Sequence, residues 1–311
     1  MRIVFLGSGS FAIPCFEALL EAGHDVLALV TQPDREQGRG QAVAPPPIKP
    51  IADRRGVPVL QPRQVREPEA QEALRRLHPE LLVVVAFGQI LPRSVIDIAP
   101  RGTLNVHASL LPKLRGAAPI QWAIATGETE TGVTTMLIDE GLDTGPTLLS
   151  RRTPIGAEET AADLAPRLAR LGAEVLLETL RGLAAGTLAP APQDQSRATL
   201  APMLKKEDGR IDWARPAREV ACRTRGFQPW PGAFTAHDGR LLKALRVREE
   251  PGAAAVADPG TVVAVGAEGV TVACGEGTLL GLVEVQPESR RAMPASAWAQ
   301  GARIRPGTRL G

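Results

Sequence analysis

The chain opens with a strand–helix–strand pattern that only a few folds accommodate. An apolar run at residues 2–6 ends in a glycine- and serine-rich turn at 7–10, and a second apolar run at 26–30 follows a stretch with helical spacing. Two wholly apolar runs joined by a helix indicate neighbouring parallel strands in a sheet that is covered on both faces.

The same pattern continues through the first half of the chain. Further apolar runs lie at 57–60, 81–86 and 104–106, with helical spacing at 67–77 and 160–184. We therefore predict an α/β domain with a doubly wound, mainly parallel, Rossmann-like sheet for residues 1–189.

After residue 208 the pattern changes to short apolar runs separated by glycine-rich turns. A helical stretch at 215–225 precedes candidate strands near 233–237, 241–247, 261–266, 269–274 and 278–285. Short strands at such regular spacing are typical of a small β-barrel. We predict an OB-like β-barrel domain for residues 208–311, joined to the first domain by an alanine- and proline-rich linker at 190–207.

Residues 33–50 interrupt the α/β pattern with a stretch rich in glycine and proline. A segment of this length without a pattern of its own is either a functional loop or disordered. It carries Arg35, Arg39 and Lys49, and the planar guanidinium group suits contacts with phosphates and base edges.

Positive charge is concentrated in the second half. Residues 206–311 contain 15 Lys and Arg against 12 Asp and Glu, whereas the whole chain has 36 against 34. A basic C-terminal domain is compatible with a polyanionic partner. A solvated basic face explains the same balance equally well, so composition leaves both readings open.

The cysteines and the N-terminus bear on the compartment. Cys15, Cys222 and Cys274 lie far apart and form no C-x-x-C pair, which is typical of a reducing compartment and argues against a disulfide framework or a zinc site. No apolar run approaches the roughly 18 residues of a membrane span, and the chain begins with a strand pattern rather than a signal peptide. We expect a cytoplasmic monomer without a membrane partner.

The turn after the first run reads Gly7-x-Gly9-x-x-Ala12, which matches the dinucleotide-binding fingerprint in spacing and position. Asp34 stands near the place where that fingerprint has an acid for the ribose. It follows Pro33 and opens the irregular loop, however, which is a poor position for a ribose contact. A tight turn before a helix also serves a small anion or a folate-type ligand, so a nicotinamide dinucleotide is one alternative.

Asn105 and His107 lie at the end of a predicted central strand. Side chains alternate along a strand, so both point to one face while Val106 points to the other. The carboxyl end of such a strand is where α/β sheets bind ligands. Asn could donate to a developing oxyanion, and His could donate to the same oxygen or move a proton. The alternative is that both side chains only satisfy backbone groups at a strand end.

The segment Asp-Glu-Gly-Leu-Asp-Thr-Gly at 139–145 places Asp143 between two glycines. Glycines on either side permit a sharp loop that projects the carboxylate into a cleft. Asp143 is therefore a candidate to orient His107 and to relay protons through water. The alternative is a turn aspartate that caps its own loop. No Ser or Cys stands in a G-x-S-x-G elbow, so a nucleophilic triad is not indicated.

Together, longer segments resemble the methionyl-tRNA formyltransferases, a family of the folate-dependent formyltransferase superfamily, in order and spacing over nearly the whole chain. They are Gln-Pro-Asp-Arg at 32–35 with Gly-Arg-Gly at 38–40, the stretch 83–92, Asn-Val-His-Ala-Ser-Leu-Leu-Pro at 105–112, Arg-Gly-Ala-Ala-Pro-Ile-Gln at 115–121, Gly-Leu-Asp-Thr-Gly at 141–145, Ile-Asp-Trp at 211–213 and Pro-Trp-Pro-Gly at 229–232. The Gly-Arg-Gly loop and Ile-Asp-Trp narrow the resemblance from the superfamily to the tRNA enzymes.

This resemblance implies transfer of a formyl group from 10-formyltetrahydrofolate to the α-amino group of methionyl-initiator tRNA, for translation initiation and without a metal. It implies that Asn105, His107 and Asp143 are catalytic. The implied folate-binding residues are Phe87, Gly88, Ile90, Leu91, Pro92, Ser109, Leu110, Leu111 and Pro112. The implied tRNA-binding residues are Arg39 in the inserted loop and Lys206 in the linker.

Two kinds of alternative remain at the level of sequence. A formyltransferase acting on a glycinamide nucleotide or an amino sugar would share the three catalytic residues. An NAD-dependent oxidoreductase, or an RNA-binding protein without catalysis, would share the scaffold. The oxidoreductase alternative predicts nicotinamide binding, and the RNA-binding alternative predicts tRNA binding without folate dependence.

Overall fold

The computed structural model describes residues 1–37, 42–250 and 256–311. Two compact units are formed. The N-terminal unit comprises Met1–Pro119, Thr131–Thr153 and Ala165–Pro202. The C-terminal unit comprises Ile120–Glu130, Pro154–Leu164 and Met203–Gly311. The domain limits drawn from the sequence stay a prediction, while the units show that residues 190–202 cluster with the first part of the chain.

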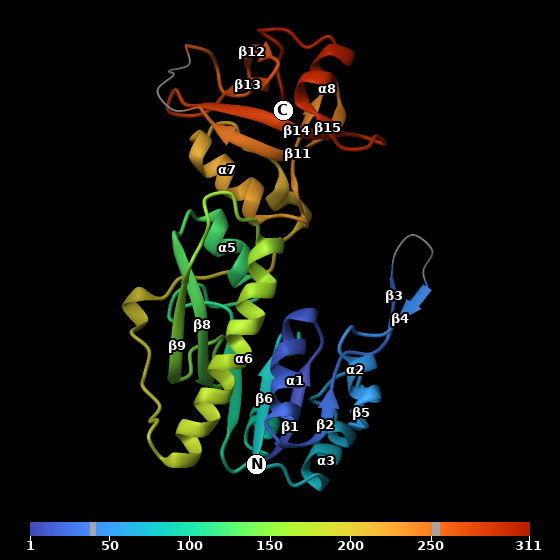
Figure 1. Cartoon of the computed structure of the whole chain (residues 1–311), viewed down its shortest axis with the longest axis vertical. Coiled ribbons are helices and arrows are strands. Elements are labelled where there is room, and N and C mark those ends of the chain that lie inside the picture. The colour runs from blue at the N-terminus through green and yellow to red at the C-terminus, as the bar shows by residue number, and fades with distance from the viewer. Residues whose placement is uncertain (38–41, 251–255) are drawn as a thin grey trace. The chain divides into compact units, whose positions relative to one another are not determined.

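The N-terminal unit contains a seven-stranded sheet in the order β5-β2-β1-β6-β7-β8-β9 (Figure 1). Its strands are β1 (Arg2–Gly7), β2 (Asp25–Val30), β5 (Val59–Leu60), β6 (Leu81–Val85), β7 (Thr103–His107), β8 (Glu130–Leu137) and β9 (Thr147–Pro154). Pairing is parallel from β5 to β7 and antiparallel between β7 and β8. The predicted mainly parallel, Rossmann-like sheet is confirmed.

Helices cover this sheet as the apolar runs predicted. They are α1 (Ile13–Glu21), α2 (Lys49–Arg54), α3 (Pro68–Arg76), α4 (Arg93–Ile96) and α6 (Ala161–Ala185). Along β1, Val4 and Leu6 join one buried cluster, whereas Phe5 packs edge-on against Phe16 of α1 with ring centroids 5.3 Å apart. Alternate residues of one strand are thus buried on opposite faces, which accounts for its unbroken apolar run.

Strand β8 was not predicted from the sequence, because polar residues interrupt its apolar pattern. Thr134 and Thr135 are fully buried in it. The Thr134 hydroxyl donates to the Ser109 carbonyl at 2.7 Å, and the Thr135 hydroxyl lies 2.8 Å from that of Thr179 in α6. Hydrogen-bond partners of this kind offset the free-energy cost of burying a hydroxyl. Because the partners lie far away in the chain, the local sequence does not predict them.

The segment 33–50 is more regular than its composition suggested. Its described residues form a short antiparallel hairpin of β3 (Arg35–Gln37) and β4 (Ala42–Ala44), followed by α2. The hairpin projects away from the seven-stranded sheet (Figure 1). Arg39 lies outside the described residues.

The C-terminal unit contains a six-stranded antiparallel sheet, with five strands in the order β10-β11-β14-β13-β12 and β15 paired to β14. The strands are β10 (Ala233–His237), β11 (Arg240–Glu249), β12 (Val262–Gly266), β13 (Gly269–Ala273), β14 (Leu279–Pro287) and β15 (Met293–Pro294). Helices α7 (Ala217–Gly226) and α8 (Ala295–Gly301) and the tryptophans Trp213 and Trp298 complete its core. The short strands predicted after residue 208 are confirmed, and they form an antiparallel sheet.

A helix from the first half of the chain also packs within this unit. Helix α5 (Pro119–Ala125) places Trp122 against Phe227, with ring centroids 5.4 Å apart. The Arg223 guanidinium lies 5.6 Å from the Trp122 ring and 4.9 Å from the Phe227 ring. A guanidinium over two ring faces adds a cation–π attraction of about 0.5–2 kcal/mol.

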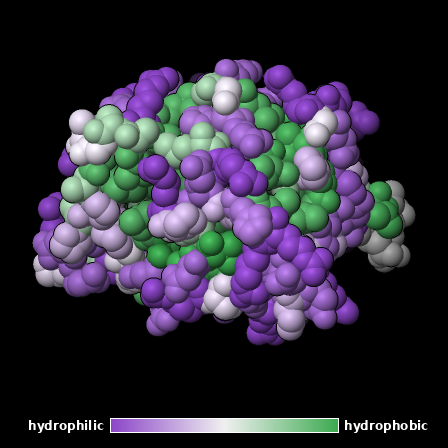
Figure 2. All heavy atoms as spheres, turned by 90° about the horizontal axis from the view of Figure 1, so that it is seen from below, coloured by the Kyte–Doolittle hydropathy of each residue, from purple (hydrophilic) through white to green (hydrophobic). Residues whose placement is uncertain are grey.

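No helix among the described residues combines the length and the apolar composition needed to cross a membrane. Helix α6 has 25 residues but carries several charged ones. Figure 2, which views the molecule from below, shows hydrophobic groups interrupted by hydrophilic ones. Such a mixture is ordinary for a protein surface that contacts water.

Candidate active site

The loops that follow β1 and β6 meet at the edge of the sheet where the parallel strand β7 also ends. The Ser8 backbone N–H donates to the Ala86 carbonyl at 3.3 Å, and the Ser8 hydroxyl donates to the Phe87 carbonyl at 3.2 Å. The turn after β1 is therefore joined to the loop after β6. This edge lies at the carboxyl ends of parallel strands, where open α/β sheets bind their ligands.

Three of the predicted residues converge beside this edge. Asn105 and His107 extend from the same face of β7 toward Asp143. The Asn105 amide nitrogen Nδ2 lies 3.4 Å from Asp143 Oδ1, and His107 Nδ1 lies 3.7 Å from Asp143 Oδ2. The second distance exceeds that of a hydrogen bond and becomes an ion pair only when the imidazole is protonated.

The other nitrogen of His107 determines which ring atom can exchange a proton. Nε2 lies 3.0 Å from the Leu114 carbonyl oxygen, and a carbonyl only accepts hydrogen bonds. Nε2 therefore carries a proton in this arrangement. Nδ1, which faces Asp143, is the atom that gains or loses the second proton. The His107 side chain is 7% exposed, so its orientation is held by packing.

The loop that carries Asp143 is capped by a different aspartate. In the described part of the chain Asp139 Oδ1 accepts from the Gly141 N–H at 3.0 Å and from the Thr144 hydroxyl at 2.7 Å. Asp143 has a positive φ of 51°, and its Oδ2 accepts from the Gly116 N–H at 2.8 Å. The carboxylate of Asp143 is thus directed across the loop to the residues of β7, and the turn-capping alternative applies to Asp139.

The predicted folate-binding loop after β6 offers both a fixed backbone and an exposed apolar side chain. Phe87 is buried, and its carbonyl also accepts from the Gln32 side chain at 3.1 Å. Gly88 takes a φ of +80°, and Ile90 is 93% exposed, with Leu91 and Pro92 half-buried beyond it. Among the described residues the buried amide nitrogen Nε2 of Gln89 has no hydrogen-bond partner.

The predicted folate-binding loop after β7 is braced from within. The buried Ser109 hydroxyl donates to the Lys113 carbonyl at 2.6 Å. The Leu111 N–H donates to the Thr134 hydroxyl at 3.2 Å, and the Leu111–Pro112 peptide is cis. Leu110, Leu111 and Pro112 are half-buried. The Ser109 side chain thus shapes the loop.

The structure argues against dinucleotide binding, because Asp34, the acidic residue expected to contact the ribose, is already paired. Asp34 pairs with Lys49 at 2.8 Å and accepts from the Gln61 side chain at 2.6 Å. These hydrogen bonds, with Gln61 first and Lys49 next, lower the pKa of Asp34. A carboxylate occupied in this way is not presented to a ribose.

Three residues that were not among the predicted site residues form a hydrogen-bonded group near Asp143. Arg115 is 5% exposed, and its guanidinium donates to the side-chain carbonyls of Gln193 and Gln195. Arg115 stands within a family segment, but both glutamines lie in the stretch expected to be a linker. No local signal could have found them, because the contact spans 78 positions of the chain.

Of the two predicted tRNA-binding residues, the structure describes Lys206 only. Lys206 is exposed in a 3-10 turn of the C-terminal unit. Arg39 lies outside the described residues. No cluster of three or more potential metal ligands is found in the part of the chain that the structure describes.

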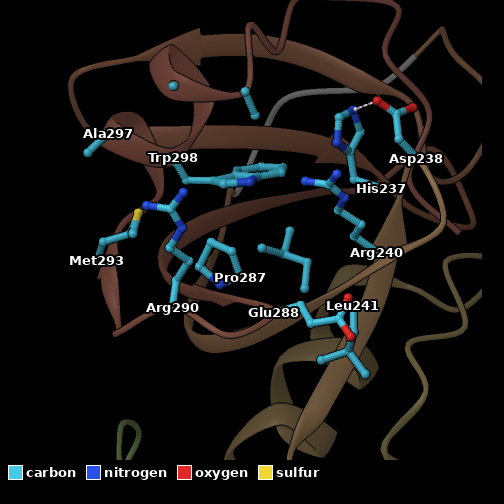
Figure 3. A pocket seen from close by; sticks show the side chains of 13 residues that line it. His237, Asp238, Arg240, Leu241, Pro287, Glu288, Arg290, Met293, Ala297 and Trp298 are labelled. Atoms are coloured by element: carbon cyan, nitrogen blue, oxygen red, sulfur yellow. Dashed lines mark ion pairs between the residues drawn. The ribbon is translucent and has the colours of Figure 1, made fainter.

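The C-terminal unit has an open cavity of about 550 Å³ beside Trp298. Figure 3 shows Arg240 and Arg290 with their guanidinium groups on either side of the indole, and the ion pair of His237 with Asp238 at 3.6 Å. Neither guanidinium has a hydrogen-bond or ion-pair partner among the described residues. The carboxylates of Asp238 and Glu288 also line the hollow, so an anion bound there would have to be held by the two guanidinium groups against this negative charge.

Family models match both parts of the chain. The model described as "Formyl transferase" matches residues 1–180, and the one described as "Formyl transferase, C-terminal domain" matches residues 203–303. The chain is 51% identical over its full length to the methionyl-tRNA formyltransferase of Citrifermentans bemidjiense, of which it covers 96%. It is 54% identical to that of Solibacter usitatus, with 100% of this chain and 99% of the relative covered.

Solved structures show the same fold in more distant proteins. The sugar 3N-formyl transferase WlaRD, solved in the presence of dTDP and 5-N-formyl-THF, matches with a TM-score of 0.68 at 16% identity, covering 94% of this chain and 99% of that chain. HypX from Aquifex aeolicus, in complex with tetrahydrofolic acid, matches with a TM-score of 0.62 at 20% identity, covering 96% of this chain. The match spans 47% of the longer HypX chain.

Proposed function

Because the chain belongs to the formyl transferase family, with methionyl-tRNA formyltransferases as full-length relatives, we propose that it formylates methionyl-initiator tRNA. The formyl donor is 10-formyltetrahydrofolate, and the product is N-formylmethionyl-tRNA for translation initiation. The observation that carries the proposal is the convergence of Asn105, His107 and Asp143 at the ligand-binding edge of the sheet.

The three side chains suit direct acyl transfer. The α-amino nitrogen of the methionyl group forms a bond to the formyl carbon, and negative charge develops on the formyl oxygen. The Asn105 amide and protonated His107 Nδ1 donate hydrogen bonds to that oxygen. Preorganised donors of this type each lower the barrier by about 3 kcal/mol. The bond from the formyl carbon to the donor nitrogen then breaks.

Asp143 manages the protons of the same reaction. The attacking amine loses one proton to the Asp143 carboxylate through water, and the leaving folate nitrogen gains one. The carboxylate is held for this task by the Gly116 N–H at 2.8 Å, which leaves Oδ1 toward Asn105. No metal-ligand cluster is needed for these steps.

Two observations support a folate in the loops after β6 and β7. The exposed Ile90 provides an apolar surface for a planar ring system. The unpartnered Gln89 amide nitrogen is a donor that a ligand acceptor would satisfy once the loop adjusts. Of the distant structures, HypX was solved in complex with tetrahydrofolic acid and WlaRD in the presence of 5-N-formyl-THF.

Two arginines of the C-terminal cavity are candidates for contact with a tRNA substrate. Arg240 and Arg290 present unpaired guanidinium groups beside Trp298 (Figure 3), and guanidinium groups bind RNA phosphates through paired hydrogen bonds. We assign them to the tRNA backbone, together with Arg39 and Lys206. Because bound phosphates release counterions, affinity for tRNA should fall as salt is added.

The decisive experiment measures formyl transfer from 10-formyltetrahydrofolate to charged initiator methionyl-tRNA. Elongator methionyl-tRNA, free methionine and a dTDP-amino sugar serve as parallel acceptors. We expect turnover with the initiator tRNA alone. Turnover with the amino sugar instead would overturn the proposal in favour of the sugar enzymes that share the fold.

A further inference from the structure

Residues 193–201, which we call the strap, run alongside the loop that follows His107. The Arg115 N–H donates to the Thr199 carbonyl at 2.9 Å, and the Ala201 N–H donates to the Arg115 carbonyl at 2.7 Å. The Leu114 N–H donates to the Thr199 hydroxyl at 2.9 Å. Leu114 is also the residue whose carbonyl holds His107. The strap is thus tied by its backbone to the active-site loop.

Arg115 fixes the orientation of the first side chain of the strap. Its Nε and Nη2 donate to Gln193 Oε1 at 3.1 and 2.6 Å, and its Nη1 donates to Gln195 Oε1 at 2.8 Å. All of its hydrogen-bond partners within the described ranges are neutral. A guanidinium can only donate, so the oxygen of Gln193 must face Arg115 and its NH₂ group must face away.

The NH₂ group of Gln193 then reaches the loop that carries Asp143. Nε2 donates to the Asp143 carbonyl at 2.8 Å and to the Gly145 carbonyl at 2.7 Å. Two bonds from one amide thus hold the carbonyls of Asp143 and Gly145, and Asp143 has a φ of +51°, a conformation that non-glycine residues rarely adopt. The Asp143 carboxylate in turn accepts from Gly116, which follows Arg115 in the chain.

We propose that Gln193 is a positioning residue for catalysis, which keeps the Asp143 carboxylate directed at Asn105 and His107, and that Arg115 sets its amide orientation. In its effect on turnover the inference rests on the proposed function. A misplacement of a catalytic group by about 1 Å can lower turnover on the order of a hundredfold, so a residue that only positions Asp143 can have a large effect.

The variant Gln193→Glu distinguishes the positioning of Asp143 from mere binding of Gln193 to Arg115. The new carboxylate keeps, and strengthens, the contact with Arg115, but it loses both donors and sets an oxygen against two carbonyls. Gln195→Glu is the matched control, because Gln195 also binds Arg115 and, among the residues that the structure describes, makes no hydrogen bond to the Asp143 loop. We expect kcat to fall on the order of a hundredfold in Gln193→Glu only, with the KM for both substrates unchanged.

Two further readouts keep the proposal testable. In an Asp143→Ala background, Gln193→Glu should cause no additional loss of kcat, whereas a general structural role would give additive losses. Hydrogen exchange of residues 139–146 should quicken in Gln193→Glu and stay unchanged in Gln195→Glu, a result that does not depend on the substrate. Gln193→Ala replaces Gln193→Glu if the latter does not fold.

The outcomes distinguish this inference from the proposed function. Equal kcat in the Gln193 and Gln195 variants, or equal exchange of residues 139–146, overturns the role of Gln193. Absence of formyl transfer by the unaltered protein overturns the proposed function, and the exchange experiment then decides the positioning role alone.

Discussion

The polar groups of the site beside β7 and the two arginines of the cavity beside Trp298 differ in whether the chain supplies their partners. At the first, the Asp143 carboxylate, the His107 ring and the Arg115 guanidinium each have partners supplied by the chain. At the second, Arg240 and Arg290 have none among the described residues. Catalytic groups need a fixed geometry before the substrate arrives, whereas a surface for a polyanion is completed by the partner's own charges.

The largest effect is expected at the site with the fixed geometry. Asn105→Ala, His107→Ala and Asp143→Ala should each lower kcat by about a hundredfold to a thousandfold, since each removes a group that acts on developing charge or on a transferred proton. Single-turnover formylation measures the rate of formyl transfer, and a filter-binding assay measures the affinity for tRNA separately. Wild-type kcat in any of the three would remove that residue from the mechanism.

A smaller effect, on binding alone, is expected at the cavity. Arg240→Ala with Arg290→Ala should raise the Kd for tRNA about twofold to thirtyfold, because each ion pair at an exposed site contributes roughly 0.2–1 kcal/mol. The slope of log Kd against log salt should fall by about 2. Folate binding should not change.

Arg309→Ala is the control for this pair, because its guanidinium is near Asp258 at 3.4 Å. It should leave both the Kd and the salt slope close to the wild-type values. If Arg309→Ala weakens tRNA binding as much as the double variant does, the assignment of the cavity is wrong and general surface charge explains the binding.

Two glycines that end helices of the C-terminal unit offer a packing comparison. A Cβ at Gly226 of α7 would lie 2.6 Å from the Gln121 carbonyl, whereas one at Gly301 of α8 would meet nothing within 4 Å. Gly226→Ala should lower the free energy of unfolding by about 1–3 kcal/mol through overpacking. Gly301→Ala should be neutral or stabilising by up to about 1 kcal/mol. Urea unfolding of both variants tests this, and equal midpoints would contradict it.

The smallest effect concerns the strap and depends on pH. Asp194 accepts from the Ser196 hydroxyl and N–H, and these bonds lower its pKa. A lowered pKa in the folded state stabilises the fold above the ordinary pKa of aspartate, and this contribution is lost as pH falls through the lowered value. Asp194→Ala should therefore have a slightly lower urea midpoint at pH 7, and the difference should vanish in acid. A difference that persists there would show that the charge is irrelevant.

Much of the fold followed from local pattern. Strands β1, β2, β6 and β7, helix α6 and the sequence of C-terminal strands stood out because their apolar spacing repeats along the chain. Strand β8 and the hairpin of β3 and β4 did not. The buried threonines of β8 depend on partners far away in the chain, and the hairpin is too short to show a period.

The sequence by itself determined the family and the three catalytic candidates, since Asn105 and His107 lie two positions apart on a strand and Asp143 lies in a recognisable loop. Only the tertiary structure decided that Asp139 caps that loop, that His107 exposes Nδ1 to Asp143, and that Gln193 holds the Asp143 backbone. The physical reason is range. Periodicity and turn residues act between neighbours in the chain, whereas hydrogen bonds of side chains join whichever residues the folded backbone brings together.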